Sequence, residues 1–298
     1  MNLLKDKRLK EQRFCKVFFA TLLIISNIHF SNAQSVDQIL QVFKKSSHTF
    51  QNTTLPYSIA YPVNYDPNIT YPVVLCLHGA GERGTENDKP IRKHSMATTW
   101  AKYSNQLKNP CIVIVPQCPK AKKWNYVDWG KGSFNIDEIE VGNELLTAID
   151  LLDSLIDELN IDKNRQYVTG LSMGGYGTWD VVTRYPNRFA AAVPMSGAGD
   201  PSKITNLKNT PIWNFHNTQD QIVPVEGSRK MIDAMKKAGL KVIETPDMSD
   251  KALDKQLKKN VKYLYTETEE GNHGPWEPWY ENPKLHEWMF SQTKNDDI

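Results

Sequence analysis

Short apolar runs alternate with longer amphipathic stretches along most of the chain. The runs Val73–Leu77 and Ile112–Val115 are typical of strands that are buried on both faces of a sheet. In residues 138–159 the apolar positions recur every three or four residues, which predicts a helix with one apolar face. We expect further strands at Tyr57–Tyr61, Gln166–Thr169, Phe189–Val193, Ile212–Phe215 and Val261–Tyr265, and further helices before Pro186, at Glu226–Ala238 and at Pro283–Phe290.

This alternation predicts an α/β fold. Strands that alternate with helices form a mostly parallel central sheet with helices on both faces. No internal repeat or linker divides the chain, so residues 34–298 are expected to form a single domain.

One segment before the last expected strand differs in composition. Residues 244–260 contain four lysines and three aspartates but few large apolar residues. Charge runs usually face solvent, so we interpret this segment as an exposed, helical surface insertion. A lid over the functional site is the alternative.

Residues 1–33 have the three parts of a secretory signal peptide. A basic start is followed by the apolar run Val17–Ile25 and by small residues at Ser31 and Ala33. The apolar run is too short to cross a bilayer comfortably, although an uncleaved anchor is the alternative. We therefore expect export to the periplasm or the medium, without stable membrane insertion after cleavage.

The charge balance changes when this segment is set aside. The chain carries a net charge of +2, and residues 1–33 contribute six Lys/Arg and two Asp/Glu, or +4. The remaining residues therefore carry about −2, so nothing in the charge favours nucleic-acid binding.

Three cysteines follow the signal segment: Cys76, Cys111 and Cys118. An odd number argues against a full disulfide framework, and a bridge between Cys111 and Cys118 is left open. No Cys/His cluster has the spacing of zinc ligands, so no metal or other cofactor is expected.

The strongest local motif is Gly170-Leu171-Ser172-Met173-Gly174, between an expected strand and an expected helix. This is the context of a nucleophile elbow, in which a strained turn points the serine oxygen out of the sheet. Glycines two positions before and after the serine avoid collisions there. The motif predicts Ser172 as a nucleophile.

A serine nucleophile needs a base, and the base needs an acid partner. In this context the partners follow in the order serine, acid, histidine. Asp220 lies 48 residues after Ser172, and His273 lies 53 residues after Asp220. Both follow expected strands, so both should lie at the carboxyl edge of the sheet.

Other residues compete for these roles. Asp200 also follows a strand and is the alternative acid. His216 precedes Asp220 closely and is expected to support its loop instead. His286 falls within the last helix, and His94 precedes the serine and is outside the required order.

An oxyanion hole would complete the site. One donor is expected to be the backbone N–H of Met173, the residue after the nucleophile. The other is expected to be the N–H of Ala80, in the loop His78-Gly79-Ala80-Gly81 that follows the strand Val73–Leu77.

Three segments together resemble a known family. Residues 77–84, 170–179 and 272–276 are similar to the secreted bacterial α/β-hydrolases of the "predicted peptidase" group, which are close to feruloyl esterases, acetyl-xylan esterases and polyhydroxybutyrate depolymerases. The resemblance covers roughly residues 55–290. It implies the α/β-hydrolase fold, the same Ser172, Asp220 and His273 triad, and an esterase more than a peptidase. Residues 244–260 are longer than the family pattern.

Aromatic residues near the expected site suggest a substrate. We expect Trp124, Trp129 and Trp276 to line the cleft, because flat aromatic faces suit sugar rings or a feruloyl group. The hypothesis is a serine carboxylesterase acting on acetyl or feruloyl esters of plant or algal polysaccharide. The alternatives are a serine peptidase of short peptides and, more remotely, a non-catalytic binding protein.

Overall fold

The computed structural model describes residues 34–294, apart from 247–248, 250 and 270. The predicted signal peptide, residues 1–33, lies outside the described residues.

A sheet of nine strands forms the centre of the described part, in the order β1-β2-β4-β3-β5-β6-β7-β9-β8. The pairings of β1 with β2 and of β2 with β4 are antiparallel, and every other pairing is parallel. The strands are β1 (Phe43–Phe50), β2 (Thr53–Ala60), β3 (Tyr71–Leu77), β4 (Ile112–Pro116), β5 (Ile161–Leu171), β6 (Ala191–Met195), β7 (Ile212–Asn217), β8 (Val242–Thr245) and β9 (Tyr263–Thr268).

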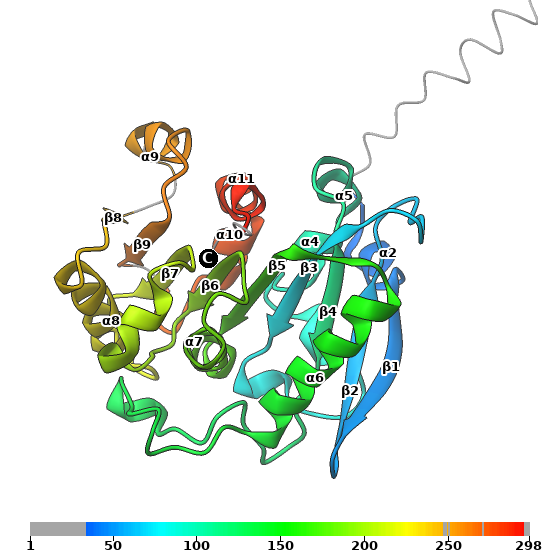
Figure 1. Ribbon diagram of the computed structural model, residues 1–298, viewed down its shortest axis with the longest axis horizontal. Coiled ribbons are helices and arrows are strands. Elements are labelled where there is room, and N and C mark those ends of the chain that lie inside the picture. Colours follow the sequence, from blue (N-terminus) through cyan, green and yellow to red (C-terminus); the bar gives the residue numbers. More distant parts are fainter. Residues whose placement is uncertain (1–33, 247–248, 250, 270, 295–298) are drawn as a thin grey trace, which may run out of the picture. The chain divides into compact units, whose positions relative to one another are not determined.

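Helices cover both faces of this sheet (Figure 1), as the sequence predicts. The α-helices are α2 (Val36–Leu40), α3 (Lys89–Arg92), α4 (Thr98–Ala101), α5 (Tyr103–Lys108), α6 (Asn143–Glu158), α7 (Met173–Arg184), α8 (Glu226–Lys237), α9 (Lys251–Leu257), α10 (Trp276–Glu281) and α11 (Pro283–Ser291). Short 3-10 helices are η1 (Ala80–Glu82), η2 (Trp129–Lys131) and η3 (Pro201–Leu207).

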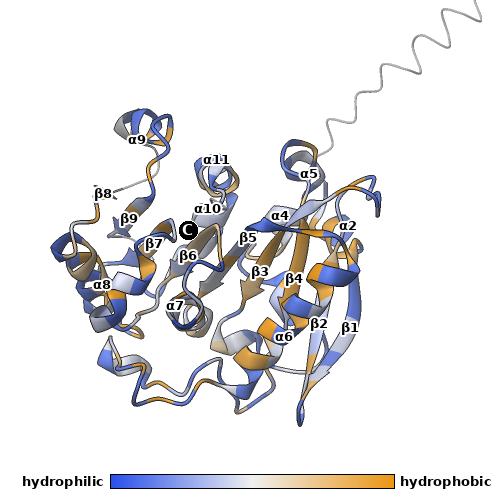
Figure 2. Ribbon diagram, viewed as in Figure 1, coloured by the Kyte–Doolittle hydropathy of each residue, from blue (hydrophilic) through white to orange (hydrophobic). Residues whose placement is uncertain are grey.

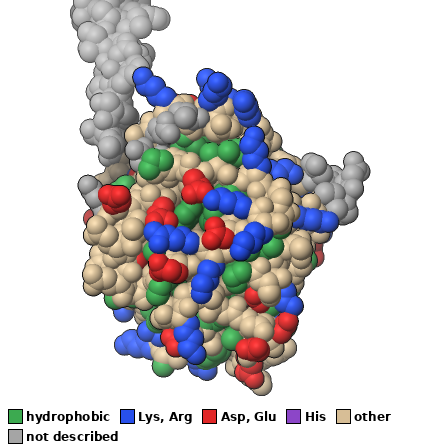
Figure 3. All heavy atoms as spheres, turned by 90° about the vertical axis from the view of Figure 1, so that its left-hand side faces the viewer, with side chains coloured by type: hydrophobic (Ala, Val, Ile, Leu, Met, Phe, Trp, Pro, Cys, Tyr) green, Lys and Arg blue, Asp and Glu red, His purple; other side chains and the backbone are tan. Residues whose placement is uncertain are grey.

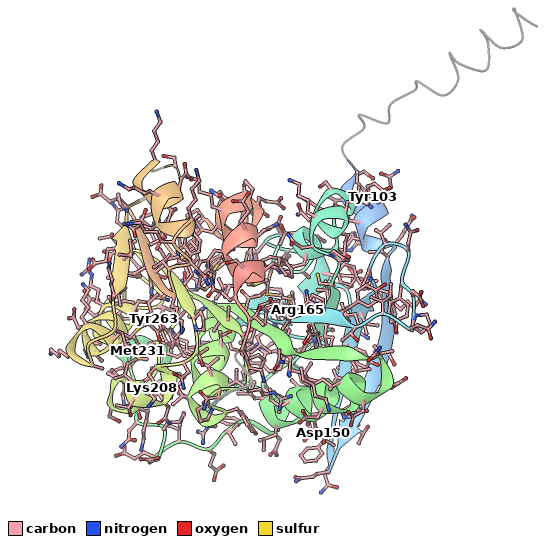
Figure 4. The ribbon with its side chains drawn as sticks, turned by 45° about the horizontal axis from the view of Figure 1, so that its top comes forward. Tyr103, Asp150, Arg165, Lys208, Met231 and Tyr263 are labelled. Atoms are coloured by element: carbon pink, nitrogen blue, oxygen red, sulfur yellow. The ribbon has the colours of Figure 1, made fainter. Side chains whose placement is uncertain are left out.

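The core has two layers because successive strand residues point to opposite faces. In β3, Val73 and Leu75 belong to the layer that also contains residues of α6, α7 and α8, while Val74 and Cys76 belong to the layer that contains residues of α2, α4 and α11. Figure 2 shows the hydrophobic colour concentrated in the central strands and in bands along α6. Figure 4 labels Met231, which α8 contributes to the first layer.

Tyr263 ties the start of β9 to the segment that precedes β7. Its hydroxyl donates to the carbonyl of Lys208, and both residues are labelled in Figure 4. This bond helps to hold β9 in its parallel register beside β7.

Two edge strands have no sequence signal. β1 exposes most of its side chains and pairs with β2 through the backbone, so its residues need no apolar alternation. β8 is a short strand at the other edge. The helix predicted over 138–159 starts later, at Asn143, because Val141 forms a bridge with Asn125 and Gly142 donates to the carbonyl of Trp124.

The charged segment 244–260 is only partly helical. Its first two residues belong to β8, and α9 lies within it. Leu253 is buried against the second core layer, and Asp254 pairs with Lys284 of α11 at 2.6 Å. These contacts dock α9 on α11.

Charges of both signs share the face that carries α8 and β8. Figure 3 shows Lys and Arg side chains interspersed with Asp and Glu there. Lys236 pairs with Glu244, and Arg229 pairs with Glu226 and Glu267. This face therefore has no continuous basic surface. Among the described helices, none has the length and apolar content needed to cross a bilayer.

Cys76, Cys111 and Cys118 are all free and buried, so the Cys111–Cys118 bridge that the sequence left open is not formed. Burial raises the pKa of the Cys111 thiol to about 12 and also raises the pKa of Cys76 and Cys118.

We expect all three thiols to resist alkylation at pH 8 in the folded protein and to react in guanidinium chloride without any reductant. Peptide mass spectrometry before and after unfolding checks this. A pair that becomes reactive only after reduction would contradict the free-thiol state.

Candidate active site

Ser172 occupies a strained turn between β5 and α7. Its backbone has φ 54° and ψ −118°, a region that costs a non-glycine residue of the order of 1–3 kcal/mol. The surroundings leave no room for a side chain two positions before or two positions after Ser172. A Cβ on Gly170 would lie 2.4 Å from the carbonyl oxygen of Gly174, and one on Gly174 would lie 1.8 Å from that of Leu77. The glycine spacing therefore has a steric cause.

The structure brings Ser172, His273 and Asp220 together, although they lie 101 and 53 residues apart in sequence. Ser172 Oγ is 2.8 Å from His273 Nε2, and His273 Nδ1 is 2.7 Å from Asp220 Oδ2. A carboxylate can only accept from the ring, so Nδ1 carries the proton and Nε2 faces the serine hydroxyl as an acceptor. This tautomer suits proton transfer from Ser172.

Asp220 is held ionised by its surroundings. Burial by itself raises the pKa of a carboxyl group, but here hydrogen bonds from His216, His273 and the Val223 N–H hold the pKa of Asp220 well below its ordinary value. Oδ1 accepts from the backbone N–H groups of Ile222 and Val223 at 2.9 and 2.8 Å. The carboxylate therefore has a defined orientation toward His273.

His216 lies in the loop of Asp220, as expected. Its Nε2 is 3.0 Å from the carbonyl oxygen of Val223 and 3.3 Å from Asp220 Oδ2. Its Nδ1 is 2.7 Å from Ser228 Oγ on α8. This fully buried ring connects the loop that carries Asp220 to α8.

Two of the competing residues, Asp200 and His286, lie elsewhere in hydrogen-bond networks of their own. Asp200 caps η3 by accepting from Ser202, and it also accepts from the Ile136 N–H. His286 is buried in α11, with Nε2 2.8 Å from the carbonyl oxygen of Tyr280. Neither contacts Ser172, Asp220 or His273.

His78 orients the loop that contains Ala80. The N–H of Cys118 donates to its Nε2 at 2.9 Å, so Nδ1 carries the proton and donates to the carbonyl oxygen of Gly79 at 2.6 Å. Carbonyl and N–H point in opposite directions across a trans peptide, so this bond also fixes the direction of the Ala80 N–H. Burial lowers the pKa of His78 to about 4, which keeps the ring neutral. In the sequence, His78 stands out only as part of the motif His78-Gly79-Ala80-Gly81, and this role was not predicted.

Met173 follows Ser172 directly and is the first residue of α7. The first N–H groups of a helix have no partner within the helix. Its N–H is therefore available to an anion at this end of α7.

The prediction that Trp124 lines the cleft is wrong. Its side chain is fully buried in the core layer of α6 and α7, and its indole N–H donates to the His78 carbonyl at 2.9 Å. Trp124 thus supports the loop of Ala80 from inside. A large apolar side chain can line a cleft or fill a core, and the sequence alone did not distinguish these two positions for Trp124.

Trp129 and Trp276 are partly exposed. The Lys123 ammonium lies 4.4 Å from the ring centre of Trp129. It therefore occupies one face of that indole. Trp276 packs edge to face against His273 with ring centres 5.0 Å apart. Only Trp276 of the three tryptophans contacts a residue of the Ser172–His273–Asp220 set.

The sheet, the elbow and the order of these residues define the α/β-hydrolase fold. Comparison with solved structures agrees. A thermostable esterase is 35% identical, with a TM-score of 0.72 over 86% of this chain and 64% of its own. The feruloyl esterase module of Clostridium thermocellum is 17% identical, with a TM-score of 0.53 over 83% of this chain and 86% of its own, and shows the shared fold alone.

The family follows from the sequence itself. Residues 47–284 match the model of the esterase family described as "Putative esterase", and the chain belongs to that family. The bifunctional acetylxylan esterase/xylanase of Neocallimastix patriciarum is 26% identical over 172 residues. That match covers 57% of this chain but only 22% of the relative. The comparisons thus place the chain in an esterase family and confirm the resemblance seen in the sequence.

The steric account of the elbow predicts the effect of Gly174→Ala. The added methyl group would collide with the backbone of Leu77, so we expect a loss of unfolding free energy of about 3 kcal/mol. Gly81→Ala is the control, because a Cβ there meets nothing within 4 Å, and it should change stability by less than about 0.5 kcal/mol. Urea unfolding measures both, and equal effects would contradict the account.

The neutral His78 ring predicts a pH dependence of stability. An unfolded histidine binds a proton below about pH 6.5, whereas the folded His78 does so only near pH 4, so its contribution falls as the pH drops through this window. Between pH 7 and 5, wild type should lose about 2 kcal/mol more than His78→Asn, which has no titrating ring. Urea unfolding at both pH values measures the difference, and parallel losses would disprove the assignment.

Proposed function

We propose that this protein is a serine carboxylesterase that hydrolyses acyl esters through an acyl-enzyme on Ser172. The observation that supports this most directly is the continuous hydrogen-bonded chain Ser172–His273–Asp220, with links of 2.8 and 2.7 Å. It lies at the carboxyl edge of the sheet, where α/β folds bind ligands. Membership of the esterase family supports the same chemistry.

In the first step Ser172 Oγ attacks the ester carbonyl carbon while His273 Nε2 takes the hydroxyl proton. Asp220 stabilises the resulting imidazolium through Nδ1–H and keeps the ring in place. The tetrahedral oxygen accepts hydrogen bonds from the N–H groups of Met173 and Ala80. The C–O bond to the alcohol then breaks, and the alkoxide oxygen takes the proton from His273.

In the second step water attacks the acyl-enzyme. His273 removes a proton from the water as its oxygen bonds to the acyl carbon, and returns that proton to Ser172 Oγ as the acyl–serine bond breaks. The products are an alcohol and a carboxylic acid, and the enzyme returns to its starting state. No step requires a group from outside the chain except water.

The substrate that we propose is an acetyl or feruloyl ester of a plant or algal polysaccharide. The acetylxylan esterase relative supports this choice. The export expected from the predicted signal segment also supports it, since an enzyme reaches plant or algal polysaccharide only outside the cell. Of the three tryptophans expected to contact the sugar, Trp124 is buried, and Trp129 and Trp276 are the candidates that remain.

Acetate and ferulate release from acetylated, feruloylated arabinoxylan tests the proposal. Wild type should release one or both acids, and Ser172→Ala should lower the rate by about 10⁴-fold or more, because it removes the nucleophile. A short chromogenic acetate ester and its amide analogue separate the chemistry from the polymer. Cleavage of the ester without release from the polymer would reject the polysaccharide. Faster cleavage of the amide would favour a peptidase, and binding without turnover a non-catalytic protein.

The acid is tested by a matched pair of variants. Asp220→Asn should lower kcat by about 10⁴-fold, because it favours the wrong tautomer of His273. Asp200→Asn alters the alternative acid, whose partners are Ser202 and Ile136, and should leave the rate per folded molecule unchanged. The opposite result would move the acid to Asp200.

A further inference from the structure

Two serines adopt positive φ side by side at the edge of the sheet. Ser172 follows β5 with φ 54°, and Ser196 follows β6 with φ 48°. Their preceding residues, Leu171 and Met195, are paired across the two strands, so the two serines follow neighbouring strand ends at the same level of the sheet. Positive φ is costly for a non-glycine residue and often marks a functional constraint. The proposed ester hydrolysis gives Ser196 no role.

Ser196 is fully buried, and its hydroxyl oxygen receives a hydrogen bond from Trp276. The indole Nε1–H donates to Ser196 Oγ at 3.0 Å. The chain must double back for this contact. Gly274 has φ 142°, and a Cβ there would lie 2.3 Å from the indole nitrogen. Gly274 thus lets Trp276 fold against the sheet edge just after His273.

Trp276 is packed between two imidazole rings. His273 meets it edge to face at 5.0 Å and 82°, and His94 meets it at 4.7 Å and 79°. His94 Nε2 lies 3.7 Å from the buried carboxylate of Glu82, in the loop that follows Ala80. The indole therefore joins the loops after β3, β6 and β9. This packing suits a structural support better than an exposed surface on which a sugar ring could stack.

The hydrogen bonds of His273 leave one motion of its ring unrestrained. Nδ1 and Nε2 bond outward from opposite sides of the ring, so a tilt of the ring about the axis through these two atoms changes both bond lengths little. A perpendicular indole edge against the ring resists this tilt. Tilt matters because Nε2 must face first Ser172 and then the leaving oxygen.

We infer that Ser196 and Trp276 are positioning residues for His273. The Ser196 hydroxyl anchors the indole to the end of β6, and the indole sets the plane of the imidazole. The inference rests on the proposed function, since its effect passes through His273 to Ser172. It also assigns Trp276 to the machinery of turnover rather than to the wall of the substrate cleft.

The test uses Trp276→Phe, Ser196→Ala and the double variant. Two quantities are measured: kcat and KM for a short chromogenic acetate, and the rate of Ser172 labelling by a fluorophosphonate. Each single variant should lower kcat and the labelling rate by about tenfold, with KM changed by less than about twofold. The double variant should be no slower than the slower single variant, because both remove the same bond.

The control removes the same kind of bond from the core. Trp213 Nε1 donates to Thr266 Oγ1 at 2.9 Å between β7 and β9. Trp213→Phe and Thr266→Val should lower thermal stability without changing the labelling rate per folded molecule. Ser196→Gly guards against misfolding, because it removes the hydroxyl but accepts positive φ, and it should show the same loss of rate as Ser196→Ala.

The outcomes separate the two proposals. If wild type labels at Ser172 and Trp276→Phe raises KM at unchanged kcat while Ser196→Ala is silent, Trp276 is a substrate contact and the inference is overturned. Additive losses in the double variant would also overturn it. If wild type is not labelled at Ser172, the proposed function fails and the inference fails with it.

Discussion

The close approach of three backbones beneath Ser172 is the constraint on which the site depends. The carbonyls of Leu77 and Met195 lie so near the start of α7 that Gly174 and Gly175 have no space for a Cβ. This contact holds the ends of β3, β5 and β6 at one level. The loops that carry Ala80, Ser172 and Ser196 therefore leave the sheet at the same place. A looser elbow would separate Ser172 from the loops that carry Ala80 and Ser196.

Rigidity at this edge is reinforced from the core. Trp124 and His78 are both buried, and each holds one carbonyl of the segment 78–79. His216 does the same for the acid loop from the side of α8. In each case a buried polar group bonds to a neighbouring carbonyl oxygen, which makes it costly to displace. Buried side chains thus set the directions of the groups to which the proposed function assigns bond making.

The fold follows from the sequence wherever burial is symmetric. β3 and β4 are covered on both faces, so their residues are uniformly apolar and their positions are predictable. β1 exposes polar residues and is held by backbone pairing, which leaves no periodic trace. The early start predicted for α6 fails for a related reason, since the bridge of Val141 to Asn125 and the turn at Glu138 keep these residues out of the helix.

The site is predictable where the chemistry needs one residue type in one local conformation. The glycines around Ser172 are such a case, because any Cβ would collide with backbone. The tryptophans are not. Trp124 and Trp276 each combine apolar area with an N–H donor, and each uses that donor inside the protein, on the His78 carbonyl and on Ser196 Oγ. An indole near a catalytic loop in sequence can therefore be a support as readily as a substrate contact. Which of the two it is depends on the acceptor that its N–H finds, and only the three-dimensional structure supplies that acceptor.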